Sequence, residues 1–384
     1  MRKTLLASNL VIGAALAAPT ALARGSEDDI GTRPAGAAIV AEGDLGGSKT
    51  KQAPDAQVVQ QEQGPRRDLV VAEERPKDWY LLDAGLRTHR DTFIGLASLS
   101  AAQSRNERFY GALSLALIRN DAGSHFGAAQ LGIGRNLSDE FGGVAQLSLG
   151  ENRARYFYGL GQVTLGYNRS QEFVGALQLA GYNRADESFG GALQLGGYNR
   201  AGGDFVGLAQ IGVFNAQGKE LFEDGDDSTL WALGQFGVFN YANAFRGIAQ
   251  IGGASLATDF SGGLQIGVVA GAQTFRGLAQ IGAASLSERS SGGQLGLANL
   301  AFKEHSGLQL GGGNYAETVH GVQLGLANIS DKANGVQIGL FNHAKRLRGV
   351  QIGLLNHAED GVLEWSPVLN MGFEEAPKQV GSRR

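Results

Sequence analysis

The sequence contains no cysteine, which excludes disulfide bonds, cysteine-ligated zinc or iron–sulfur sites and thiol nucleophiles. Charged residues make up only 18% of the chain, and the formal net charge of -4 gives no reason to expect a nucleic acid as a partner. None of the 7 prolines lies between Pro76 and Pro367, as expected where nearly every backbone N–H group belongs to a β-sheet ladder. Glycine is abundant, at 60 of 384 residues, but lacks the three-residue period of collagen. What remains is a glycine-rich, mostly β protein.

The N-terminus has the pattern of a secretory signal peptide. Arg2 and Lys3 precede an apolar stretch over 5–18, and the small residues around Leu22 predict cleavage after Ala23. The apolar stretch is shorter than the ~20 residues of a membrane-spanning helix. We therefore expect residues 1–23 to be removed and the mature chain to be exported to the bacterial outer membrane or cell surface.

Residues 24–78 differ in composition from the rest of the chain. They contain four prolines and scattered charges, with no sustained period of 2 or 3.6 residues. This composition predicts a flexible linker. Its two short apolar runs, 37–41 and 69–72, are the expected contact points for other envelope proteins.

One motif recurs through the chain after the linker. Residues 173–183 read F-V-G-A-L-Q-L-A-G-Y-N, and residues 189–199 read F-G-G-A-L-Q-L-G-G-Y-N. The side chains alternate with a period of 2, typical of β-strands, and the segments between copies carry turn residues and nearly all the charge. Ser98 and Ser114 stand at the central position of two early copies, and Leu82 lies where a further one would fall. In the other copies the centre is glutamine, at a regular interval that shortens slightly along the chain and is broken by one insertion: Gln130, Gln146, Gln162, Gln178, Gln194, Gln210, Gln235, Gln250, Gln265, Gln280, Gln294, Gln309, Gln323, Gln337 and Gln351.

Two all-β architectures fit this repeat over 79–373. The first is an antiparallel transmembrane β-barrel of about 18 strands. An 11-residue strand is about 36 Å long and, tilted by ~45°, crosses about 25 Å, the height of the apolar band of such barrels. Strands almost free of charge, and aromatic residues near both strand ends, favour this architecture, and residues 365–373 alternate like a terminal barrel strand. The expected fold is therefore the barrel, followed by a C-terminal tail over 374–384.

The alternative is a β-solenoid with 14–16 residues per coil, in which Gln and Asn side chains stack as ladders. Nearly uniform turn lengths favour it, and identical strands give no source for the stagger that a closed barrel requires. The shortest copies also lose one residue before the glutamine, which predicts shorter strands or the loss of a bulge there.

The last copies resemble a known family. Residues 335–342 read G-V-Q-I-G-L-F-N and residues 349–356 read G-V-Q-I-G-L-L-N, similar to bacterial surface-repeat proteins built from tandem G-V-Q-I-G-L-x-N units. Residues 359–373 resemble the terminal segment of that family. The resemblance implies a signal-bearing cell-surface or outer-membrane protein with no established activity, so it transfers no functional residues.

No catalytic motif stands out, so we expect neither an enzyme nor a cofactor. The one long insertion, 217–230, is acidic, and oxygen ligands suit Ca²⁺, which makes Asp224, Asp226 and Asp227 weak metal candidates. Their spacing matches no EF-hand, and a solvated acidic loop is the simpler interpretation. His343 and His357 hold equivalent positions in two copies, but no third ligand lies nearby, so they are interpreted as turn residues.

The sequence thus predicts an outer-membrane β-barrel surface protein with a structural or porin-like passive channel role and outer-membrane lipid as its surroundings. A secreted β-solenoid surface scaffold or adhesin is the alternative. No residue pattern supports binding of nucleic acid.

Overall fold

The computed structural model describes residues 79–218 and 227–373. The chain divides into two units, Met1–Ala72 and Glu73–Arg384, and every described residue belongs to the second. The predicted signal peptide, linker and C-terminal tail lie outside the described residues. No helix in the two described ranges has the length and apolar composition needed to cross a membrane.

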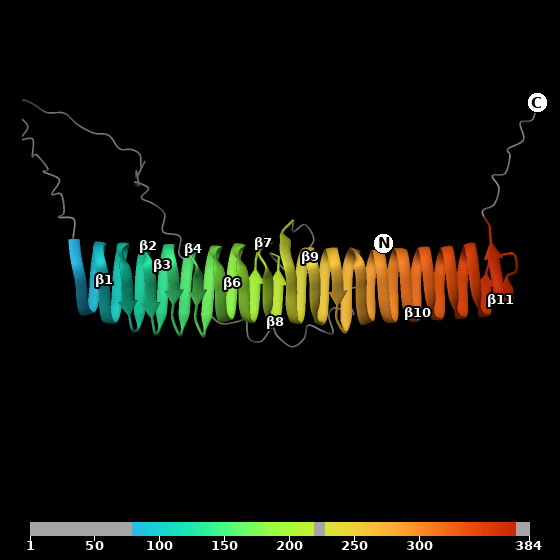
Figure 1. The fold of residues 1–384 in the computed structure, drawn as a ribbon, viewed down its shortest axis with the longest axis horizontal. Helices are drawn as coiled ribbons and strands as arrows, with labels where there is room; N and C mark the ends of the chain where they lie inside the picture. The colour runs from blue at the N-terminus through green and yellow to red at the C-terminus, as the bar shows by residue number, and fades with distance from the viewer. Residues whose placement is uncertain (1–78, 219–226, 374–384) are drawn as a thin grey trace, which may run out of the picture. The chain divides into compact units, whose positions relative to one another are not determined.

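The described residues form one 11-stranded sheet (Figure 1). Several strands bend around corners without a break, so a single strand, such as the 90-residue β10, passes through many copies of the repeat. The strands are β1 (Trp79–Ala116), β2 (Arg119–Gly132), β3 (Arg135–Leu147), β4 (Glu151–Tyr158), β5 (Gly161–Val163), β6 (Tyr167–Ala201), β7 (Phe205–Val206), β8 (Ala209–Gln217), β9 (Thr229–Ile266), β10 (Val269–Ala358) and β11 (Trp365–Gly372).

Each copy of the repeat pairs in parallel with the next copy. Gln103 of β1 lies beside Arg119 of β2, and Val269 of β10 lies beside Ala254 of β9, so each residue pairs with its equivalent one repeat away. The chain therefore winds as a β-solenoid, and one turn of it, called a coil below, is one copy of the repeat. Equivalent positions of successive coils lie side by side.

The predicted antiparallel transmembrane barrel of about 18 strands is therefore wrong, and the fold is the alternative β-solenoid. A barrel would join neighbouring copies by hairpins, whereas here neighbouring copies run in the same direction. Alternation with a period of 2 describes both arrangements equally, so it could not separate them. The uniform turn lengths were the better guide.

Of the two sets of aromatic residues expected as membrane girdles, the set at the starts of the copies forms an internal stack instead. The aromatic residue that opens each early copy, phenylalanine in all but one of them, is fully buried, and its ring packs on the ring of the next coil. The rings of Phe141 and Phe157 lie 5.0 Å apart with an interplanar angle of 1°. The column begins with Phe93 and Phe109, and the main apolar core contains its later members Phe141, Phe157, Phe173, Phe189, Phe205, Leu230, Phe245, Phe260 and Phe275.

The terminal segment 365–373, interpreted above as a barrel strand, closes one end of the solenoid. Strand β11 pairs antiparallel with the last coil, from Gly349 beside Gly372 to His357 beside Trp365. This is the one antiparallel pairing among the described strands. By covering the backbone of the last coil, β11 removes an open sheet edge that would otherwise pair with another chain.

The shorter coils make one corner with glycine. Gly292, Gly307, Gly321, Gly335 and Gly349, each two residues before the glutamine, have φ between 122° and 144°, which L residues with a side chain rarely adopt. A Cβ atom at Gly335 would also lie 2.0 Å from the carbonyl oxygen of Gly321. The residue missing from these copies is thus compensated by a glycine-specific backbone conformation.

We expect Gly335→Ala to lower the stability of the solenoid by about 2 kcal/mol or more, because it combines a strained φ with a backbone clash. Gly313→Ala is the matched control, since a Cβ there meets no atom within 4 Å. The midpoints of urea unfolding for the two variants and the unmodified chain measure the effect. Equal midpoints for the two variants would show that this corner is not constrained as described.

Candidate interaction surface

A continuous ladder of glutamine side chains runs inside the solenoid. Each Gln donates a hydrogen bond from Nε2 to the Oε1 atom of the Gln in the preceding coil, with donor–acceptor distances of 2.7–3.0 Å from Gln146 to Gln351. All of these side chains are buried. The repeat-defining glutamines therefore hold the coils together and are not exposed to a ligand.

A second ladder, of asparagines, runs in the opposite sense. Asn152 donates from Nδ2 to Oδ1 of Asn168 in the following coil at 3.0 Å, and also to the backbone carbonyl of Val163 at 2.9 Å. The acceptor at the open end of each ladder has no partner: Oε1 of Gln351 for the glutamines, and Oδ1 of Asn136 for the first run of asparagines. Nearly all amide groups between these ends are satisfied by their neighbours, as buried polar groups usually are.

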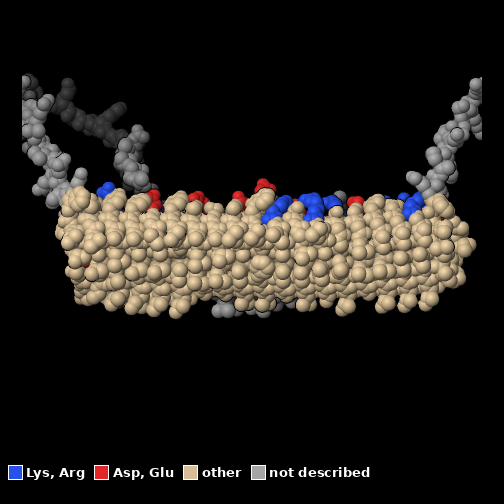
Figure 2. All heavy atoms as spheres, in the orientation of Figure 1, with Lys and Arg blue, Asp and Glu red and all other residues tan. Residues whose placement is uncertain are grey.

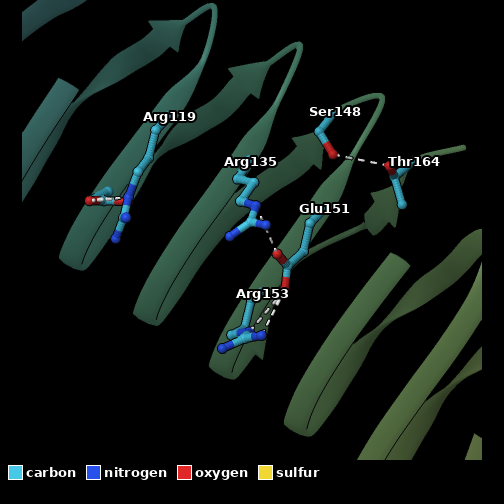
Figure 3. A network of polar contacts seen from close by, with 7 residues as sticks. Arg119, Arg135, Ser148, Glu151, Arg153 and Thr164 are labelled. Carbon is cyan, nitrogen blue, oxygen red and sulfur yellow. Dashed lines mark hydrogen bonds and ion pairs between the residues drawn. The ribbon is translucent and has the colours of Figure 1, made fainter. Parts of the chain in front are cut away.

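The side of the coil that begins just before the asparagine carries most of the charge. Arg135 lies 3.5 Å from Glu151 of the next coil, and Arg153 contacts the same carboxylate at 2.9 Å (Figure 3). Arg119 pairs with Asp121 within its own coil, although it also lies in register with Arg135. The carboxylates between them thus offset the repulsion that stacked arginines would otherwise produce on adjacent strands. These groups neutralise one another along the stack.

A different side of the coil is free of charge and exposed. We define the apolar face as the first and third residues after each ladder glutamine. Every first residue is Leu, Ile, Val or Phe, and every third residue is Ile, Leu, Val, Ala or Gly. Leu297, Leu326 and Leu354 at the third position are 73%, 63% and 71% exposed. Figure 2 shows a face of the stack almost without charge and charged side chains gathered along one edge.

The apolar face is hollowed into a groove near its C-terminal end. Leucine and isoleucine side chains line it, with glycines between them, and Val368 of β11 closes its end. A second, smaller groove repeats the pattern near the N-terminal end, between Leu117 and Leu149. The face is thus ridged along the stack, with one ridge per coil.

The metal candidates of the insertion are not brought together as a site. Asp224 and Asp226 lie outside the described residues, and Asp227 is exposed. Across the two described ranges no group of three or more His, Asp and Glu side chains is placed to hold a metal ion. The insertion leaves the ladder intact, since Gln235 donates to Gln210 at 2.8 Å across it.

The two histidines interpreted above as turn residues lie within β10 and contact each other. His343 and His357 stack with ring centroids 4.9 Å apart, and their Nδ1 atoms are 2.7 Å apart. Burial, together with the neighbouring His357, lowers the pKa of His343. The ring centroid of Trp365 in β11 lies 4.1 Å from that of His357. The pair therefore joins the last coils to β11.

One unusual residue escaped the sequence-based search. His125 occupies the phenylalanine position of its coil, one repeat after Phe109 and one repeat before Phe141, and its ring stacks between theirs. It is fully buried and neither ring nitrogen has a hydrogen-bond partner. Burial lowers its pKa to about 3. The sequence alone could have revealed His125, because aligning the copies of the repeat places a histidine at the phenylalanine position.

Breaking the glutamine ladder should be costly. Gln265 donates to Oε1 of Gln250 and to the carbonyl of Gly271, and it accepts from Gln280. Gln265→Leu leaves buried amide atoms without partners, so we expect a loss of about 1–3 kcal/mol of stability, measured by urea unfolding. Gln273→Leu, the same change at an exposed glutamine, is the control. An unchanged midpoint for Gln265→Leu would contradict the structural role of the ladder.

Replacing His125 should stabilise the protein. His125→Phe completes the aromatic column and removes two unpaired buried nitrogens, for a gain of about 1–3 kcal/mol. The folded pKa is depressed, so the unfolded state binds the proton first, and this histidine costs stability progressively as pH falls from 6.5 towards 3. The advantage of the variant in unfolding midpoint should therefore widen between pH 7 and pH 4. A constant difference would contradict the burial of His125.

Comparisons with known proteins do not assign this chain to a family. Neither protein-family models, nor curated proteins, nor solved structures yield a match to it. The structural result is that the chain is a β-solenoid repeat scaffold with one charge-free exposed face.

Proposed function

We propose that the chain is an exported, non-catalytic scaffold at the bacterial cell surface. The observation that carries this proposal is the unbroken glutamine ladder from Gln130 to Gln351. In each of these coils it devotes one inward side chain to joining that coil to its neighbours. Such a chain is built to maintain a long, regular surface rather than to enclose a substrate.

The porin-like channel role predicted above is ruled out by the fold. A channel needs a barrel with an open lumen, and here the inward side chains fill the coil. Gln178 and Phe173, expected on opposite faces of a barrel strand, are both fully buried inside the solenoid. The alternative role, a secreted surface scaffold or adhesin, is the one that fits these contacts.

Two further features support the location. The signal-like sequence over 1–23 directs the chain out of the cytoplasm. The complete lack of cysteine means that the scaffold needs no thiol chemistry, and its cohesion comes from amide ladders that are independent of the redox environment. Exposed amines such as those of Lys303 and Lys345, on the charged side of the coil, would then be reachable from outside the cell.

Labelling of intact cells tests this proposal. A membrane-impermeant amine reagent should modify the full-length protein on whole cells, and a chain lacking residues 1–23 should remain unmodified until the cells are lysed. A cytoplasmic protein of the bacterium serves as the internal control for cell integrity. Equal protection of both chains on intact cells would refute surface location.

A further inference from the structure

The apolar face is too large to be left in water. Fifteen coils at the ~4.8 Å spacing of strands extend for about 70 Å, and three residues at ~3.3 Å each span about 10 Å, so the face covers roughly 700 Å². Monomeric soluble proteins rarely expose a contiguous apolar patch of more than ~300–600 Å². A face of this size, ridged and without charge, marks a binding surface.

We propose that the apolar face binds the apolar face of a second copy of this chain. The proposal rests on the scaffold function given above and names its partner. Two such faces bury roughly 1,400 Å² in total, within the ~1,200–2,000 Å² of stable, specific protein interfaces. A two-fold arrangement needs only one self-complementary patch, which a regular row of Leu, Ile and Val side chains provides.

The spacing of the ridges also favours a second copy. Rows of side chains on the apolar face repeat once per coil, at the distance between hydrogen-bonded strands, and another solenoid of the same sequence has the same spacing. Ridges of one copy can therefore fit between ridges of the other along the whole face, as the side chains of paired sheets do in dry interfaces. The groove lined by Leu297, Leu326 and Leu354 offers such a recess.

The charges argue against a lipid surface as the partner. Helices and sheets that lie on membranes usually flank the apolar side with unpaired basic residues, which attract anionic lipids. Here Arg135 and Arg153, beside the face, are paired with a carboxylate, and the formal net charge is -4. A second copy brings an uncharged surface and needs no such attraction.

The other exposed apolar side is less suited to pairing. It lies between the phenylalanine and glutamine positions, and arginines interrupt it at Arg246, Arg276 and Arg348. Its leucines are nevertheless as exposed as those of the apolar face, with Leu278 at 77%. This side therefore supplies matched control positions for a test.

The mass of the chain over 24–384 in detergent-free buffer, measured by light scattering and sedimentation velocity, tests the proposal. We expect a dimer for the unmodified chain and for the control L233R/I248R/L278R. The variant L297R/L326R/L354R should be monomeric, with a dimer dissociation constant at least about 100-fold weaker, because it places buried like charges at the interface. Circular dichroism of both variants verifies that the solenoid is folded.

Two outcomes would overturn the pairing. The first is a mass other than that of a dimer for the unmodified chain, or a dimer that persists in L297R/L326R/L354R. The second is flotation of the unmodified chain with phosphatidylcholine vesicles that the same variant abolishes, which would assign the face to lipid. Either result would leave surface labelling of intact cells unchanged, so failure of the pairing is distinguishable from failure of the scaffold function.

Discussion

The structure depends on one repeated hydrogen bond, from the amide nitrogen of a buried glutamine to the amide oxygen of the glutamine one coil earlier. This bond sets which residues of adjacent coils lie side by side, because a slip by one residue would turn the glutamine outward and leave a buried acceptor unpaired. It tolerates coils of different length, since only the position of the glutamine matters. Even across the insertion, Gln235 meets Gln210 and the register is kept.

In-register stacking has consequences for every other position. A side chain meets its own kind in the next coil, so phenylalanine stacks on phenylalanine and asparagine bonds to asparagine. On the charged side the same rule brings Arg153 beside Arg169, and carboxylates such as Asp186, which contacts Arg169 at 2.8 Å, offset the repulsion. His125 is the exception in the aromatic column, where the stacking geometry is met while its two nitrogens are left without partners.

The sequence was sufficient to find the repeat and its β character, but not the direction of the strands or the places where they break. Residues 184–188, between two copies and expected as a turn, lie within β6, whereas residues 133–134, inside a copy, interrupt the strand. Phe173 and Gln178 are separated by an odd number of positions, so simple alternation puts them on opposite faces of a flat strand, whereas a corner of the coil turns both inward. That corner depends on the path of the backbone, which local patterns do not specify. The absence of charge from the strands was ambiguous for a related reason. It indicates that the outward face is buried, but it does not indicate whether lipid or protein covers that face.

That ambiguity explains why the charge-free strands suggested a membrane protein, and why a membrane is not needed to account for them. A sheet face without charge must be covered by something apolar, and a bilayer is only one such surface. A solenoid repeats its outward residues at a constant interval, so its own second copy matches the face in length, spacing and absence of charge. Exposed leucines of the apolar face, such as Leu326 and Leu354, are then explained as the contact residues of a paired scaffold. On that view the low charge of the chain follows from a surface buried between two copies.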